Sequence, residues 1–321
     1  MVSSALYRRA IPSAARITSW IGPDGWRFRR FDWPCDAAGL RGRILWQGGR
    51  GDIFEKYLEL FAHWHAQGWS ITSLDWRGQG GSGRVSADPH VGDIDDFATY
   101  VDDFAAFWAV WSAEEAGPRV MMGHSMGGHL LARAIAESAG SGGNTAMPDA
   151  VVLIAPMMGV RSPFGAILGE AIARIIGGIG NPSRAAWKTN EKPATMATRQ
   201  KLLTHDADRY GDELWWQSAQ PELMLGPPSW RWVIEAFAST RRLRGDPRLQ
   251  KVTVPVLMLV ALADQLVLPS AAIAVADQLP DVQLVKFGRE AAHEILREAD
   301  PVRNRAIADI DAFLSVRVRV A

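Results

Sequence analysis

The chain has 321 residues, of which 48% are hydrophobic and 22% are charged, a composition typical of ordinary globular proteins rather than disordered or fibrous ones. Its 35 Lys and Arg residues balance 35 Asp and Glu residues, so the formal net charge is zero and no overall field attracts nucleic acid. The length fits one large α/β domain with an insertion as well as it fits two smaller domains.

The N-terminal segment, residues 1–20, carries Arg8, Arg9 and Arg16 and lacks the continuous apolar stretch of a secretory signal. No run in the sequence approaches the roughly 20 apolar residues that cross a bilayer. The single cysteine, Cys35, cannot form an intrachain disulfide, which fits a reducing compartment. We therefore expect a cytoplasmic protein, and peripheral contact with the inner face of the membrane stays open.

Short apolar runs separated by helical patterns predict a mostly parallel sheet. This alternation is typical of βαβ units, whose buried strands are continuous in apolar residues. The predicted strands are 42–47, 70–75, 119–123, 151–156, 255–261 and 282–287.

The clearest helix is predicted after Gly92, with aspartates at its start that interact favourably with the helix dipole. Apolar residues then recur at steps of three or four and form one stripe, which we expect to lie against the sheet. The stripe consists of Ile94, Phe97, Val101, Phe104, Trp108 and Trp111.

The β/α alternation stops after Pro156 and resumes at 255–261. We expect a core formed by residues 1–158 and 251–321, with a helical cap, residues 159–250, inserted between two strands of one sheet. The alternative is a separate C-terminal domain that begins near Gly159. It is disfavoured because the run at 255–261 resumes the buried-strand pattern.

A second apolar stripe lies inside the predicted cap. One interpretation is a mobile lid that opens at a lipid surface. The other, which we favour at this stage, is a buried helix of the cap. The stripe consists of Leu168, Ile172, Ile175, Ile176 and Ile179.

The motif Gly-His-Ser-Met-Gly at 123–127 lies between a predicted strand and a helical run, 130–137. This order is required of a nucleophile elbow, in which a sharp turn exposes the serine above the sheet. Glycines beside the serine remove side chains that would clash in such a turn. The motif therefore predicts Ser125 as a nucleophile, whereas His124 and His129 are expected to be turn and packing residues.

A serine nucleophile needs a base, and the base needs a carboxylate that orients it. Such sites supply them in the chain order Ser, acid, His. Asp264 follows the predicted strand 255–261, at the carboxyl end where open α/β sheets place their sites. His293 is the only histidine downstream of it. We predict Asp264 as the acid and His293 as the base. Competing acids lie before that strand or on or after the following helix: Asp246, Asp277 and Asp281.

Acyl transfer also needs backbone N–H donors aimed at the developing oxyanion, each worth about 3 kcal/mol of the barrier. The residue after the nucleophile supplies one, which is Met126 here. The glycine-rich stretch 47–51 follows an early strand, where the second donor is expected. We choose Gly49, with Arg50 as the next candidate.

Beyond these motifs, the chain resembles a known family of serine hydrolases, which includes monoacylglycerol lipases and bacterial lysophospholipases. The resemblance implies an α/β-hydrolase fold, in which a mostly parallel sheet flanked by helices carries an inserted helical cap. It also implies hydrolysis of a carboxylic ester with one acyl chain, with no metal and no cofactor. The similar segments are 46–50, 55–57, 75–83, 123–127, 155–157, 203–210, 221–223, 228–230 and 293–296.

Some residues depart from the family pattern or have an expected structural role. Gln47 stands where many relatives have histidine, and Leu262 stands where glycine is common. Within 75–83, which is the most distinctive segment, we expect Asp75 and Arg77 to tie down neighbouring loops.

Large apolar residues gather in the predicted cap. Such linings suit an acyl chain and exclude water, so the expected partner is a small ester or a monoacyl lipid. Two enzymatic alternatives keep the same triad, a small-ester carboxylesterase and an acyltransferase, and a noncatalytic ligand-binding protein on the same fold is a third. The predicted substrate-binding residues are Trp187, Trp215, Trp230 and Trp232.

Overall fold

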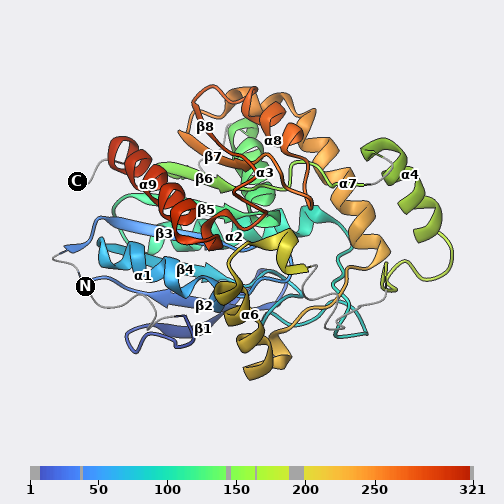
Figure 1. The fold of residues 1–321 in the computed structure, drawn as a ribbon, viewed down its shortest axis with the longest axis horizontal. Coiled ribbons are helices and arrows are strands. Elements are labelled where there is room, and N and C mark those ends of the chain that lie inside the picture. The colour runs from blue at the N-terminus through green and yellow to red at the C-terminus, as the bar shows by residue number, and fades with distance from the viewer. Residues whose placement is uncertain (1–7, 37–38, 142–145, 163–164, 188–198, 319–321) are drawn as a thin grey trace.

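One mixed sheet forms the centre of the molecule (Figure 1). The structure, a computed structural model, describes residues 8–36, 39–141, 146–162, 165–187 and 199–318. Within these residues the sheet has eight strands. They are β1 (Arg16–Ile21), β2 (Arg27–Trp33), β3 (Gly42–Gln47), β4 (Trp69–Leu74), β5 (Arg119–His124), β6 (Ala150–Ile154), β7 (Val256–Ala261) and β8 (Val282–Phe287).

The strand order is β1-β2-β4-β3-β5-β6-β7-β8. All neighbours from β4 to β8 pair in parallel, whereas β2 runs antiparallel to both β1 and β4. The six predicted strands are confirmed within one or two residues at each end. Strands β1 and β2 were not predicted, because β1 is mostly exposed and β2 carries arginines among its apolar residues.

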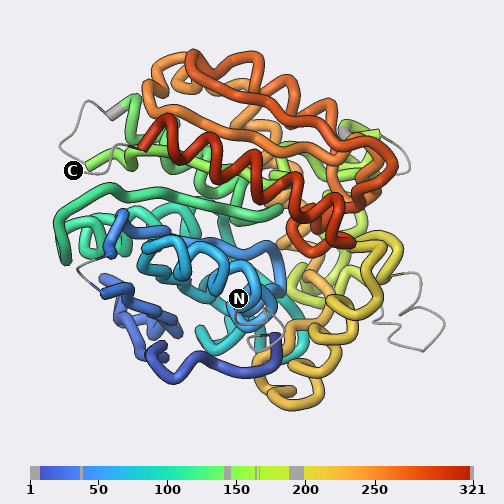
Figure 2. The backbone as a smooth tube through the Cα atoms, turned by 60° about the vertical axis from the view of Figure 1, so that its left-hand side comes forward, coloured from blue at the N-terminus to red at the C-terminus, as the bar shows by residue number. Residues whose placement is uncertain are grey.

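Helices cover both faces of the sheet (Figure 1). On one face lie α1 (Leu58–Ala66) and α9 (Asp300–Arg317), which run close together (Figure 2), and His63 of α1 binds Asp311 of α9 at 2.8 Å. The other face is covered by α2 (Phe97–Glu114), α3 (Met126–Ser141) and α8 (Pro269–Ala276). The predicted mostly parallel sheet flanked by helices is therefore confirmed.

Helix α2 begins later than the apolar stripe suggested. Asp96 caps it, since its side chain accepts a hydrogen bond from the amide of Ala98 at 2.7 Å. Asp93 lies upstream of the helix, where it is buried and binds Ser229 and Arg231. The stripe itself packs in the core as predicted.

The segment between β6 and β7 holds helices instead of strands. Strand β7 pairs with β6 in parallel, so the strands before and after the segment belong to one sheet. The helices of the segment are α4 (Ala166–Gly177), α6 (Ala207–Ala219) and α7 (Trp230–Arg244), with short 3-10 helices η4 (Pro221–Leu223) and η5 (Pro247–Lys251).

Helix α4 turns its large apolar side chains to solvent, so the favoured interpretation of a buried cap helix is wrong. Its buried residues are the small ones, Gly169, Ala173 and Gly177, which allow close packing against α7. The large residues on and just beyond α4 are 38% to 89% exposed: Ile167, Leu168, Ile175, Ile176 and Ile179. Over the described ranges, no helix has the length and apolarity that a transmembrane span requires.

Candidate active site

Ser125 lies in a strained turn between β5 and α3. Its φ is 52°, in the left-handed region that non-glycine residues rarely adopt. Three backbone hydrogen bonds hold the turn: its N–H donates to Ile154, and its carbonyl accepts from His129 and Met157. The turn therefore presents the hydroxyl in a fixed direction at the start of a helix.

The glycines of the motif allow this turn because the backbone packs closely around it. A Cβ at Gly123 would lie 2.8 Å from the backbone of Gly127, and one at Gly127 would lie 2.4 Å from the carbonyl oxygen of Gln47. Neither contact leaves room for a side chain. The elbow and the glycine-rich loop after β3 are thus packed directly against each other.

Folding brings together three side chains that are far apart in the sequence. His293 Nε2 lies 2.8 Å from Ser125 Oγ, and His293 Nδ1 lies 2.6 Å from Asp264 Oδ2. Asp264 is 1% exposed and His293 is 4% exposed. A buried carboxylate, an imidazole and a hydroxyl in this line can move a proton from the hydroxyl to the ring.

The electrostatics of the pair favour an ionised acid beside a basic ring. Burial alone would raise the pKa of the Asp264 carboxyl, but His293 and two backbone amides lower it below its ordinary value. Burial would lower the pKa of the His293 imidazole, but Asp264 raises it above the ordinary value. The ring nitrogen that faces Asp264 therefore carries a proton, and the other is available to Ser125.

The loops that carry the acid and the histidine are held by their own hydrogen bonds. Asp264 Oδ1 accepts from the amides of Leu266 at 2.7 Å and Val267 at 3.1 Å. Just before His293, the amide of Ala292 donates to the fully buried Glu298 at 2.7 Å. These contacts limit how far either side chain can rotate away.

The predicted oxyanion loop borders the nucleophile. A Cβ at Gly49 would lie 3.0 Å from the Cβ of Ser125. The N–H of Gly49, however, donates to Asp52 Oδ2 at 2.7 Å. Met126 is the first residue of α3, so its N–H has no acceptor within the helix. The two predicted donors therefore differ, because the Gly49 amide already has an acceptor.

A family model matches most of the chain. The Hydrolase_4 model, described as serine aminopeptidase, S33, covers residues 39–300. The chain belongs to the serine aminopeptidase S33 family. The matched residues include Ser125, Asp264 and His293.

Two curated relatives resemble the S33 chain over most of its length. It is 29% identical to lysophospholipase L2 of Escherichia coli strain K12 over 289 residues, which cover 83% of this chain and 78% of the relative. It is 26% identical to a probable lysophospholipase L2 of Haemophilus influenzae, with 87% and 85% covered. These relatives confirm the resemblance to bacterial lysophospholipases.

Solved structures share the fold of the S33 chain. A soluble variant of monoglyceride lipase from Saccharomyces cerevisiae, in complex with a substrate analogue, superposes with a TM-score of 0.74 at 19% identity and 97% coverage of both chains. The monoacylglycerol lipase of Paleococcus ferrophilus gives a TM-score of 0.66 at 20% identity, with 90% of this chain and 98% of that chain covered. The predicted α/β-hydrolase fold is confirmed.

The four tryptophans predicted to bind substrate differ in how far they are exposed. Trp187 is exposed, and Trp215, on α6, is partly exposed and packs edge-on against Trp216. Trp232 is buried between α7 and α2, with its ring 5.4 Å from that of Phe97. Trp230 is half-buried at the start of α7. Their part in substrate binding stays a prediction.

The imidazole rings of His124 and His129 contact residues other than Ser125. His129 Nε2 lies 2.7 Å from Ser239 Oγ, and burial, with Arg133 and Arg244, lowers the pKa of its ring to about 3. It is a neutral packing residue. His124 instead packs against His293, with ring centroids 4.8 Å apart.

Two carboxylates next to the site, those of Asp52 and Glu298, were not predicted from the sequence. Both accept backbone amides that border the triad. Asp52 stands three residues after Gly49, a spacing typical of a tight loop that closes on its own side chain, and this was the available signal. No such signal in the sequence marks Glu298, because a partner such as His205 comes near it only on folding.

Proposed function

We propose that the chain is a serine hydrolase that cleaves carboxylic esters of monoacyl lipids, either a lysophospholipid or a monoacylglycerol. The observation that carries the proposal is the continuous line from Asp264 through His293 to Ser125, with separations of 2.6 and 2.8 Å. The names of the relatives, lysophospholipase L2 and monoacylglycerol lipase, support the substrate class.

The reaction follows from the geometry of this line. His293 accepts the proton of Ser125 as Oγ attacks the ester carbonyl, and Asp264 stabilises the imidazolium. His293 then gives the proton to the leaving alcohol, and the acyl group stays on Ser125. Water attacks the acyl-enzyme with His293 again as base, which releases the fatty acid.

We propose the backbone amides of Met126 and Gly49 as the oxyanion donors. Met126 is supported by its place at the start of α3, where unsatisfied N–H groups and the helix dipole favour negative charge. Gly49 is supported by its closeness to Ser125, and its N–H, which donates to Asp52, must be shared with the oxyanion when the oxyanion forms.

We propose residues 159–250 as a cap that covers the site and contributes the apolar acyl pocket. Support comes from contacts between this segment and the core loops: the amides of His293 and Glu294 donate to the carbonyls of Leu202 and Leu203 at 3.4 and 2.8 Å. The segment thus touches the catalytic histidine directly. Its tryptophans remain the candidates for substrate contact.

We also propose that the protein touches a membrane peripherally through α4. Ile167, Ile175 and Ile176 of this helix are exposed, as is Ile179 just beyond it, and exposed apolar side chains gathered on one helix suit contact with a lipid surface. Arg174 and Arg241 both pair with Glu170, so these three side chains carry a net positive charge that suits anionic lipid. The substrate would then be taken up from the lipid surface.

A substrate panel compares the wild type with Ser125→Ala on lysophospholipids, monoacylglycerols and p-nitrophenyl esters of graded chain length, with product analysis in glycerol. We expect the wild type to release fatty acid from monoacyl lipids and the variant to release none at unchanged thermal stability. Activity confined to short esters would favour a carboxylesterase, and acyl transfer to glycerol would favour an acyltransferase. Turnover by Ser125→Ala would contradict the proposal.

A further inference from the structure

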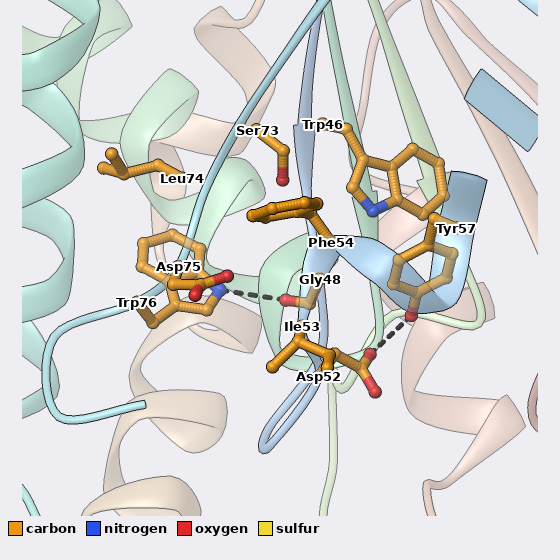
Figure 3. Close-up of a pocket in the computed structure, with 10 residues that line it drawn as sticks. All are labelled: Trp46, Gly48, Asp52, Ile53, Phe54, Tyr57, Ser73, Leu74, Asp75 and Trp76. Carbon is orange, nitrogen blue, oxygen red and sulfur yellow. Dashed lines mark hydrogen bonds between the residues drawn. The ribbon is translucent and has the colours of Figure 1, made fainter. Parts of the chain in front are cut away.

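Behind the glycine-rich loop lies another carboxylate, that of Asp52, whose side chain is 9% exposed. Its Oδ2 accepts the N–H of Gly49 at 2.7 Å and the hydroxyl of Tyr57, and its Oδ1 pairs with Lys56 Nζ at 2.7 Å. Figure 3 shows the Tyr57 hydroxyl pointing at this carboxylate, while the indole of Trp76 binds the Gly48 carbonyl from the other side. The loop is therefore held on both sides by side chains.

The same carboxylate reaches the catalytic histidine through one intermediate. His124, directly before the nucleophile, places Nδ1 3.2 Å from Asp52 Oδ2 and 3.0 Å from the Tyr57 hydroxyl. Its Nε2 lies 3.3 Å from the backbone carbonyl oxygen of His293. Both nitrogens face oxygens that only accept, so each of them carries a hydrogen when the ring bonds to both partners. In that form the His124 ring links Asp52 to the backbone that carries the base.

We propose that Asp52 is a positioning residue for the reaction at Ser125. It holds Gly49 on one side of the nucleophile and, through His124, the backbone of His293 on the other. The inference rests on the proposed function, since it assigns a task to Asp52 only if Ser125 is the nucleophile. The loop beside the nucleophile and the backbone of the base are thereby fixed by one anion, and a misplacement of about 1 Å in such a site can cost roughly 100-fold in rate.

The surroundings of Asp52 keep it an anion. Burial alone would raise its pKa, but Lys56 and His124 hold it well below its ordinary value. Lys56 is in turn kept charged, because Asp52, Glu213 and Glu294 raise its pKa against the effect of burial. A charged acceptor binds an amide more strongly than a neutral one, so Asn at this position would hold the loop less firmly.

Asp52→Asn tests the proposal, because it keeps the size of the side chain and one acceptor oxygen but removes the charge. We expect kcat for a p-nitrophenyl ester, and the rate of Ser125 labelling by a fluorophosphonate, to fall by roughly 10- to 100-fold. KM should change by less than about twofold, since Asp52 does not touch the substrate. Asp311→Asn is the matched control: Asp311 also accepts three side-chain hydrogen bonds, but on the outer layer of helices, from His63, Trp64 and Gln67.

A double-mutant cycle separates positioning from general destabilisation. His124→Phe keeps a planar ring and loses both nitrogens, so it should lower kcat. In its presence Asp52→Asn should cost less than in the wild type, because the effect that passes through His124 is already lost while the contact with Gly49 remains. If Asp52→Asn fails to fold, Tyr57→Phe removes only one hydroxyl from the cluster and should still slow labelling.

The outcomes distinguish the inference from the proposed function. Wild-type rates in Asp52→Asn, or fully additive losses in the cycle, overturn the positioning role while leaving Ser125 as the nucleophile. An equal fall in kcat for Asp311→Asn also overturns it, because replacing any carboxylate that holds neighbouring side chains would then slow the reaction. A wild type that the fluorophosphonate does not label overturns both.

Discussion

In the proposed mechanism, the pair of Asp264 and His293 sets the pH at which Ser125 becomes reactive. His293 must be neutral to accept a proton, and its pKa is raised above the ordinary value of 6.5 by Asp264, with smaller contributions from Glu294 and Asp52. We therefore expect kcat/KM for a neutral ester to rise with pH and to reach half of its maximum above pH 6.5. A profile of kcat/KM that is flat from pH 5 to 8 would argue against His293 as the base.

The Asp264→Asn variant should lower kcat by roughly 1,000- to 10,000-fold.

A single glycine in the elbow should be irreplaceable for steric reasons. In Gly127→Ala, the new Cβ would lie 2.4 Å from the carbonyl oxygen of Gln47, and backbone on both sides prevents relief. We expect a loss of about 1–3 kcal/mol in the free energy of unfolding, measured by urea denaturation, together with loss of hydrolysis. Gly211→Ala on α6 is the control, because nothing lies within 4 Å of its Cβ; it should be neutral or stabilising by up to about 1 kcal/mol. Equal stability of the two variants would refute the steric argument.

At the scale of elements, a buried ion cluster joins α6 to the core. Glu213 of α6 lies 3.1 Å from Lys56 and 2.9 Å from Arg297. Burial alone would raise the pKa of Glu213, but these cations lower it from 4.5 to about 2. Because the folded-state pKa is depressed, Glu213 stabilises the fold above pH 4.5, and this stabilisation is lost as the pH falls towards 2.

Glu213→Gln should remove that pH dependence. We expect the wild type to lose on the order of 3 kcal/mol of unfolding free energy through this group between pH 5 and 2, and the variant to lose correspondingly less. Urea denaturation at several pH values measures both. A variant whose stability falls as steeply as that of the wild type would show that Glu213 titrates normally in the fold.

The parallel strands could be predicted because apolar residues are frequent in each run and helical patterns separate the runs; the bounds of β3 and β8 match to the residue. The hairpin of β1 and β2 could not, since its exposed and arginine-bearing residues give no such signal. For α4, periodicity locates an apolar stripe but does not say which side packs. Small residues such as Ala173 take the packed side instead, because they let α4 approach α7 closely.

The meeting of Asp264, His293 and Ser125 could be predicted from the motif and the chain order. Asp52 accepts an amide only three residues away, a spacing that is visible in the sequence, whereas its contact with His124 forms only on folding. Glu298 likewise accepts from His205, 93 positions away in the sequence. A single sequence carries no trace of such long-range contacts.

For the molecule as a whole, the exposed face of α4 predicts binding to lipid vesicles. We expect the wild type to sediment with vesicles that contain anionic phospholipid, and replacement of the three most exposed isoleucines by serine to weaken binding at least about tenfold, because each buried side chain contributes roughly 1.5–3 kcal/mol. The three positions are Ile167, Ile175 and Ile179.

The control for that experiment uses exposed apolar residues elsewhere on the surface. Replacing them by serine removes a similar apolar area from β1 and α9, so vesicle binding should persist. Equal binding by both triple variants would show that α4 is not the contact. The control positions are Ile17, Ile21 and Val316.

The central claim, that His293 activates Ser125, is tested most directly by mapping a fluorophosphonate adduct by mass spectrometry. In the wild type we expect a single adduct on Ser125, because its Oγ lies 2.8 Å from the imidazole. In folded His293→Ala the adduct should be nearly absent under the same conditions. An adduct on another residue, or labelling of His293→Ala at the wild-type rate, would contradict the account.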